Sequence, residues 1–176
     1  MKLTWFGGTT LRIHIGGLIL VADAGVVPAG IDAAELVSGA DRVFGLAAAE
    51  DCLPQVDLAL WKPRRIRPLD AGPVEATILR AGAGLVLVHV DGERPLLLVA
   101  GELLPFGRWL GDAVVVLFGS AGQLVANGRN LLERQPPRLL ALAAADAELD
   151  EAIPALRAHL DDTALVALES RLGLEL

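Results

Sequence analysis

The sequence predicts a mixed α/β protein of the α+β class, with antiparallel sheet in its first part and strands alternating with helices in its last part. Glycine pairs such as Gly16-Gly17 separate the first short runs of β-forming residues, as in β-hairpins. Later, apolar runs flank two helix-like segments, and Pro136-Pro137 ends the first of them. The opening strands are expected at 2–6, 11–15 and 18–22.

The rest of the chain continues this pattern. Asp91-Gly92 provides a turn between two apolar runs, and the small residues Gly119-Ser120-Ala121-Gly122 precede the first long helix. Helices are expected at 123–134 and 147–160, and short helical turns at 31–37 and 47–52. Further strands are expected at 42–46, in the first half of 56–70, and at 74–80, 84–90, 95–100, 112–118, 138–143, 164–168 and 173–176.

Length and composition favour one soluble domain spanning residues 1–176. A chain of 176 residues can bury about 70% of its extended surface. No apolar run reaches the roughly 18 residues of a membrane span, and the start lacks the pattern of an export signal. The single cysteine, Cys52, cannot form an internal disulfide. We therefore expect a cytoplasmic protein without a membrane interaction.

The charge balance argues against a nucleic-acid partner. The formal net charge is −7, from 22 acidic and 15 basic residues, so no broad basic surface is expected. Four bases nevertheless fall within six residues: Lys62, Arg64, Arg65 and Arg67. Two prolines in the same stretch favour a stiff basic loop after a buried strand, which allows a local anion site.

Several segments, taken in order, resemble the metallo-β-lactamase superfamily. The opening 1–23 resembles its strand, glycine hairpin and strand ending in Asp-Pro, with Asp23 at the aspartate. It is most similar to the branch of ascorbate-phosphate lactonase and the phospholipase D-like hydrolases. Residues 56–70 lie on the segment that ends in the metal-binding loop, 96–102 on the strand ending in Gly-Asp-Thr, and 112–121 on the strand ending in Gly-Gly-His. The resemblance implies a compact four-layer αββα sandwich.

The metal ligands of that superfamily are replaced in this sequence. The loop His-x-His-x-Asp-His has Pro63, Arg65, Arg67 and Pro68 at its ligand positions. Proline has no side-chain donor atom and arginine stays protonated, so neither binds a divalent cation. The other histidine positions fall on Gly7-Gly8, within 80–83, and on Gly119-Ser120-Ala121. Only acids remain, Asp23 and Glu102.

These replacements favour a catalytically inactive pseudoenzyme without metal or other cofactor. The expected role is an interaction or regulatory subunit, either a homodimer or a partner of an active paralogue. Rival readings are a metal-dependent hydrolase with an atypical site and a sensor of small anions that uses Arg65 and Arg67. The candidate ligand-binding residues of the vestigial site are Asp23, Arg64, Arg65, Arg67 and Glu102.

A structural role competes with binding at each of these candidates. Arg65 and Arg67 could pair internally with Asp23 and Glu102, which we favour because buried charges are usually paired. Arg64 is expected to be solvated. His14 and His89 are expected to face solvent or a polar contact, Cys52 to be a core thiol, Ser120 a turn and helix start, and 103–110 an apolar loop that could meet a partner.

Overall fold

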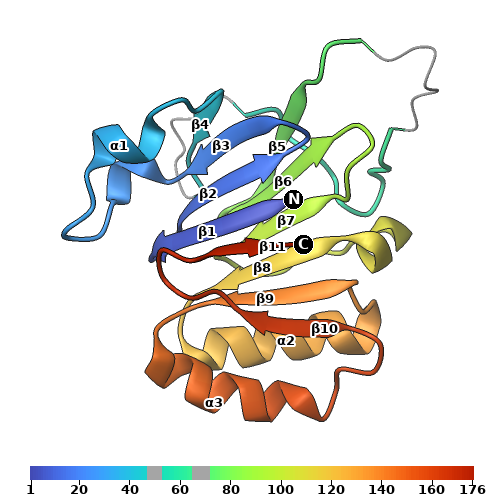
Figure 1. Cartoon of the computed structure of the whole chain (residues 1–176). Coiled ribbons are helices and arrows are strands. Elements are labelled where there is room, and N and C mark those ends of the chain that lie inside the picture. The colour runs from blue at the N-terminus through green and yellow to red at the C-terminus, as the bar shows by residue number, and fades with distance from the viewer. Residues whose placement is uncertain (47–52, 65–71) are drawn as a thin grey trace.

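Two β-sheets packed face to face form the centre of the molecule (Figure 1). The structure is a computed structural model, and it describes residues 1–46, 53–64 and 72–176. Within these residues, one sheet has five strands in the order β11-β1-β2-β3-β4, and the other has six in the order β10-β9-β8-β7-β6-β5. Helices lie outside the sheets, so the predicted αββα sandwich is confirmed.

The five-stranded sheet grows from the predicted antiparallel meander. Strands β1, β2 and β3 pair in sequence, and the β2–β3 turn has φ angles of 58° at Gly16 and 84° at Gly17, which side-chain-bearing residues rarely adopt. β4 then pairs parallel to β3, and β11 pairs antiparallel to β1. The bounds are β1 Lys2–Gly7, β2 Thr10–Ile15, β3 Leu18–Ala22, β4 Arg42–Phe44 and β11 Gly173–Glu175.

The six-stranded sheet combines an antiparallel half with a parallel half. β5, β6 and β7 are antiparallel neighbours, whereas β7, β8, β9 and β10 run parallel. The helices α2 and α3 make the crossovers between parallel strands, as the strand–helix–strand pattern predicts. The bounds are β5 Ala76–Gly82, β6 Leu85–Val90, β7 Leu96–Val99, β8 Val114–Phe118, α2 Ala121–Arg134, β9 Leu139–Ala143, α3 Asp146–Arg157 and β10 Ala164–Ala167.

Apolar side chains fill two layers of core. Inward-facing residues of both sheets, such as Leu3, Ile13, Val88 and Leu98, form the layer between the sheets. The second layer lies between the six-stranded sheet and α2 and α3, as in Figure 1. Strands β6, β7 and β8 are buried on both faces, which explains why their sequences are continuously apolar.

The outer layer over the five-stranded sheet is small. In the described residues it contains α1 (Ala33–Val37), which follows the 3₁₀ turn η1 (Ala24–Val26). Arg12 projects from β2 and donates to the carbonyls of Leu36, at 2.5 Å, and Ser38, at 3.0 Å. The side chain of Asp32 begins α1 by accepting from the amide of Ala34 at 2.8 Å.

One predicted strand is wrong. The run from Val56 to Trp61 forms a turn rather than a core strand, and its Leu60 is 76% exposed. The carboxylate of Asp57 accepts from the amide of Ala59 at 2.8 Å, and its carbonyl accepts from Trp61 at 2.9 Å. Aspartate favours such turns because its side chain can bond to the backbone two residues on. The helical turn expected at 47–52, with Cys52, lies outside the described residues.

No helix in the described part of the chain is both long enough and apolar enough to cross a bilayer.

Candidate functional site

A cleft opens where the turn after β1 meets the carboxyl ends of β7, β8 and β9. Its volume is about 560 Å³. Gly7-Gly8, where the resemblance expects Gly-His, lies in its wall, as do Gly119 and Ser120 of the segment Gly119-Ser120-Ala121, where it expects Gly-Gly-His. We call it the strand-end cleft, and it is lined by Trp5, Gly7, Gly8, Thr9, Pro28, Ala100, Phe118, Gly119, Ser120, Ala143, Ala144, Ala145 and Glu148.

Asp23 lies beside this cleft and is held by uncharged donors. Its carboxylate accepts from the hydroxyl of Thr9 at 2.5 Å and from the amide of Leu46 at 2.7 Å. Its own amide donates to the carbonyl of Phe44 at 2.8 Å. The φ angle of Asp23 is 50°, in the left-handed region that aspartate tolerates better than most residues. The acid therefore ties the end of β3 to the turn before β2 and to the end of β4.

A buried arginine that the sequence analysis did not select bonds to the same backbone segment, Gly45-Leu46, as Asp23 does. Arg80 of β5 is 9% exposed, and its Nη1 and Nη2 atoms donate to the carbonyls of Leu46 at 2.7 Å and Gly45 at 3.0 Å. Arg80 is within the segment 80–83, where the resemblance places the middle metal histidine. A sequence signal existed, because β5 alternates and Arg80 shares the inward side of Ile78.

The other predicted site residues do not form a buried charge cluster with Asp23 in the described structure. Glu102 is exposed, so it needs no buried partner. Arg64 is exposed, as predicted. Among the described residues the ion pairs are His89 with Asp91 and Arg94 with Asp112, and neither includes Asp23 or Glu102. Arg65 and Arg67 lie outside the described residues, so their pairing with the two acids stays a prediction.

The backbone amides at the start of α2 also have hydrogen-bond partners within the protein. The amide of Ser120 donates to the side-chain oxygen of Gln123 at 3.1 Å, and the amide of Ala121 donates to a carboxylate oxygen of Glu148 from α3. Ser120 is therefore a turn and helix start, as predicted. An anion at this helix start would meet the carboxylate of Glu148, so the backbone does not offer a free phosphate cradle there.

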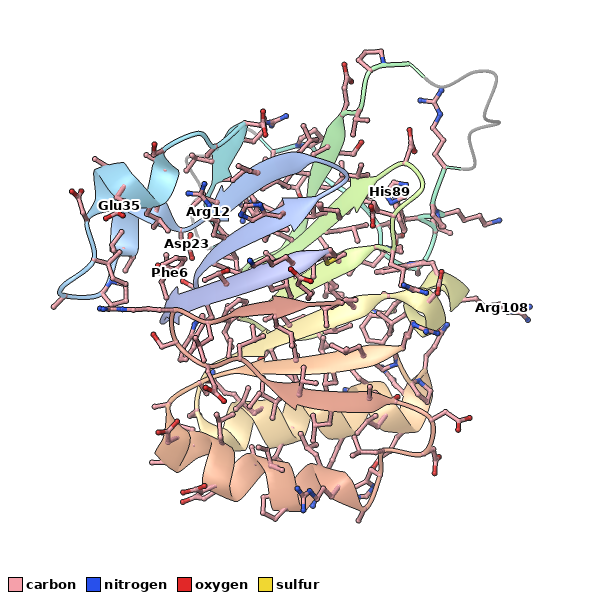
Figure 2. The ribbon with its side chains drawn as sticks, viewed as in Figure 1. Phe6, Arg12, Asp23, Glu35, His89 and Arg108 are labelled. Carbon is pink, nitrogen blue, oxygen red and sulfur yellow. The ribbon has the colours of Figure 1, made fainter. Side chains whose placement is uncertain are left out.

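Of the two surroundings expected for His89, solvent or a polar contact, the structure shows the polar contact, made from a buried position. It is 6% exposed and packs edge to face against Trp61, with ring centroids 5.3 Å apart. Its polar contact is with Asp91, at 3.5 Å. Burial lowers the pKa of His89, and the nearby carboxylate of Asp91 opposes this shift. Figure 2 shows His89 at the end of the sandwich opposite Asp23.

The described residues do not fit a divalent metal centre. Zinc sites take three or four nitrogen, sulfur or carboxylate donors that converge on the ion. Nowhere in residues 1–46, 53–64 and 72–176 do three or more histidines, cysteines or acids gather in this way. The polar groups of the side chains that line the strand-end cleft are the hydroxyls of Thr9 and Ser120, the indole N–H of Trp5, which donates to the carbonyl of Gly8, and the carboxylate of Glu148, which accepts from the amide of Ala121.

Two solved structures that are similar to this one are described as metal-dependent hydrolases. A protein of Thermotoga maritima assigned as a zinc-dependent hydrolase of the metallo-β-lactamase superfamily is 11% identical, with a TM-score of 0.51 over 95% of this chain and 98% of its own. A metallo hydrolase of the archaeon Ignicoccus hospitalis is 13% identical, with a TM-score of 0.53 over 99% and 98%. No protein-family model and no curated protein sequence matches the chain.

These likenesses extend over nearly the full length of both chains, so the protein has the metallo-β-lactamase fold. At these identities the likeness concerns the fold alone. The fold therefore defines the class of protein. The described segments in which the resemblance expects metal histidines contain none, whereas Arg65, Arg67 and Pro68 of the expected metal loop lie outside the described residues.

Proposed function

We propose that this chain is a catalytically inactive, metal-free protein with the metallo-β-lactamase fold that acts as an interaction or regulatory subunit. The observation that carries the proposal is Arg80. A buried guanidinium, fixed by the carbonyls of Gly45 and Leu46, occupies the segment in which the resemblance expects a metal histidine. Arginine offers no lone pair to a cation, and its charge repels one in a poorly solvated interior.

The strand-end cleft supports the same proposal. Glycine and alanine stand where histidines would be needed, at Gly7-Gly8 and around Ser120. Both carboxylate oxygens of Asp23, the acid at the Asp-Pro position of the resemblance, accept hydrogen bonds from the protein itself. A fold that keeps its sheets but uses its acid to fix loops is suited to presenting a surface rather than activating water.

Elemental analysis tests the metal-free part of this proposal. The protein is purified without chelators, and zinc, manganese and iron are measured per chain, with a known zinc hydrolase purified in parallel as the positive control. We expect less than about 0.1 ion per chain, and no change in melting temperature on adding a chelator. A near-stoichiometric metal whose removal lowers the melting temperature would overturn the proposal.

The proposed role as a subunit needs its own measurement. Sedimentation at micromolar concentration separates a monomer of 18.4 kDa from a homodimer of twice that mass. A dimer that dissociates on dilution would support self-association, whereas a monomer at all concentrations would require a partner with another sequence.

A metal-dependent hydrolase with an atypical site is the second candidate. It is favoured by the description of the similar T. maritima and I. hospitalis proteins as hydrolases. It would require Asp23 to release the amide of Leu46 or the hydroxyl of Thr9 and to recruit Glu102 with further donors. A rate of ester, lactone or phosphodiester hydrolysis that rises in proportion to the metal bound per chain would establish this candidate.

A further inference from the structure

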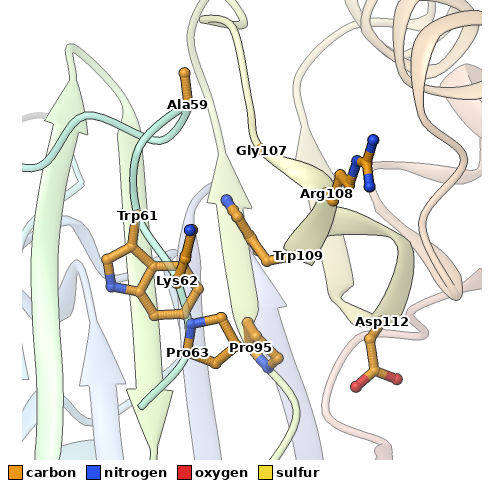
Figure 3. A pocket seen from close by; sticks show the side chains of 9 residues that line it. All are labelled: Ala59, Trp61, Lys62, Pro63, Pro95, Gly107, Arg108, Trp109 and Asp112. Atoms are coloured by element: carbon orange, nitrogen blue, oxygen red, sulfur yellow. The ribbon is translucent and has the colours of Figure 1, made fainter.

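A second hollow lies at the opposite end of the sandwich from Asp23, over the outer face of the six-stranded sheet. It measures about 780 Å³, and Figure 3 shows its lining side chains. Two segments form its walls. One contains Trp61, and the other contains the 3₁₀ turn η3 (Arg108–Asp112). We call it the tryptophan groove, and its main lining residues are Trp61, Lys62, Pro63, Pro95, Arg108 and Trp109.

Hydrogen bonds fix the walls of the tryptophan groove. The carbonyl of Leu58 accepts from the indole nitrogen of Trp109 at 2.8 Å and from the amide of Gly107 at 2.9 Å. A Cβ atom at Gly107 would lie 2.9 Å from the carbonyl oxygen of Ala59, so the two segments approach closely there. The groove is therefore formed before any ligand arrives, which lowers the entropic cost of binding.

The aromatic side chains are also held in place. Trp61 packs edge to face against His89, with centroids 5.3 Å apart, and against Trp109, with centroids 5.0 Å apart. Trp109 is 7% exposed, whereas Trp61 is only partly buried. Trp61, together with Pro63 and Pro95, thus gives the groove a rigid apolar surface suited to a flat ligand.

The charged side chains at the rim favour an anion. Lys62 and Arg108 are exposed, and neither makes an ion pair with a described residue. The acid of the lining, Asp112, pairs with Arg94 at 3.4 Å. Two cations without an ion-pair partner among the described residues lie beside an apolar surface, in contrast to the acidic chain as a whole, whose formal net charge is −7.

We propose that the tryptophan groove binds small organic anions with a flat apolar body, such as aromatic carboxylates. The body packs against Trp61 and the two prolines, and the carboxylate meets Lys62 and Arg108. The volume of about 780 Å³ lies within the range of about 300 to 1,000 Å³ that is usual for small-molecule sites. This proposal does not depend on the absence of a metal at the other end of the sandwich.

The three tryptophans give a site-resolved test. The ligands are 2-naphthoate and its uncharged counterpart 2-naphthalenemethanol, and the readout is the indole N–H resonances in nitrogen-15 NMR. Trp61 and Trp109 report on the groove, whereas Trp5 reports on the strand-end cleft. We expect 2-naphthoate to shift the signals of Trp61 and Trp109 saturably, and to bind more tightly than the alcohol. Shifts confined to Trp5, or no saturable shift, would overturn the proposal.

Charge-reversal variants test the cations. In Lys62→Glu with Arg108→Glu, we expect the affinity for 2-naphthoate to fall about tenfold or more, and the affinity for the alcohol to change little. The matched control is Arg64→Glu with Arg129→Glu, which reverses two exposed arginines that do not line the groove. Equal losses in the two double variants would overturn the proposal, because they would indicate a general charge effect.

Discussion

Arg80 and Asp23 are connected through the peptide unit between Gly45 and Leu46. The guanidinium of Arg80 donates to the carbonyl of Gly45 at 3.0 Å, and the amide of Leu46, in the same peptide unit, donates to the carboxylate of Asp23 at 2.7 Å. The two opposite charges therefore polarise one peptide from both sides, which strengthens both hydrogen bonds. A fixed cation and a fixed anion thereby hold the end of β4 without a direct ion pair.

Replacing Arg80 with methionine should destabilise the protein strongly. The variant leaves the carbonyls of Gly45 and Leu46 without their charged donor in a poorly solvated place, at an expected cost of about 2 to 4 kcal/mol. Urea unfolding measures the free energy of unfolding. The matched control is Arg64→Met, on an exposed side chain, which should change the stability by less than about 0.5 kcal/mol. Equal stabilities of the two variants would contradict a structural role for Arg80.

At Asp23, hydrogen bonding and backbone conformation can be separated. Asp23→Gly and Asp23→Ala both remove the hydrogen bonds to Thr9 and Leu46. Of the two new residues, only glycine adopts a φ angle of 50° without steric strain. We therefore expect both variants to be less stable than the parent, and the alanine variant to be lower than the glycine variant by about 1 kcal/mol. Thermal unfolding monitored by circular dichroism measures both values. An alanine variant as stable as the glycine variant would contradict the left-handed conformation.

His89 should make stability depend on pH. Burial lowers its pKa below the ordinary value of 6.5 in spite of the opposing effect of Asp91. The unfolded chain then binds the proton more readily than the folded one, so the stability is complete above about pH 6.5 and falls as the pH drops below it. His89→Phe should flatten this decline between about pH 7 and pH 5, measured by urea unfolding at each pH.

Two further variants check the assignment to His89. Asp91→Asn removes the group that raises the pKa, so its decline below pH 6.5 should be steeper than that of the parent. His14 also has a lowered pKa, caused first by burial and then by Arg12 and Lys2, and His14→Gln should flatten the remaining decline. A decline unchanged in His89→Phe would show that His89 does not carry the effect.

Most of the fold could be predicted because periodicity and turn residues agreed along the chain. The glycine pair at 16–17 and the short runs of β-forming residues in β1 to β3 indicated the meander, and Pro136-Pro137 separated α2 from β9. The segment from Val56 to Trp61 could not be assigned correctly from its apolar residues. The hydrogen bonds of Asp57 to Ala59 and Trp61 decide the turn, and Leu58 is buried without belonging to a strand.

The site was predictable only in part. The sequence indicated that Gly7-Gly8 and Gly119-Ser120-Ala121 stand where the resemblance has histidine motifs, and Gly7, Gly8, Gly119 and Ser120 lie in the strand-end cleft. It did not indicate the partner of Asp23, because hydrogen bonds to Thr9 and Leu46 depend on how distant turns meet. Arg80 was overlooked because its segment was compared with a histidine position, although an arginine on the inward side of β5 already signalled a buried charge.

Glu148 should stabilise the start of α2 from its place in α3. Its carboxylate accepts from the amide of Ala121, which is 7% exposed, at the positive end of the helix. Glu148→Gln keeps an acceptor but loses the charge, and should cost about 0.5 kcal/mol. Glu148→Ala also leaves the amide without its partner, and should cost about 1 to 2 kcal/mol. The shift in urea midpoint measures both effects. Glu151→Ala, at an exposed position of the same helix, is the matched control and should cost less than about 0.5 kcal/mol. An equal loss of stability in Glu151→Ala would mean that any glutamate-to-alanine change in α3 has this effect, and that the hydrogen bond to Ala121 does not cause it.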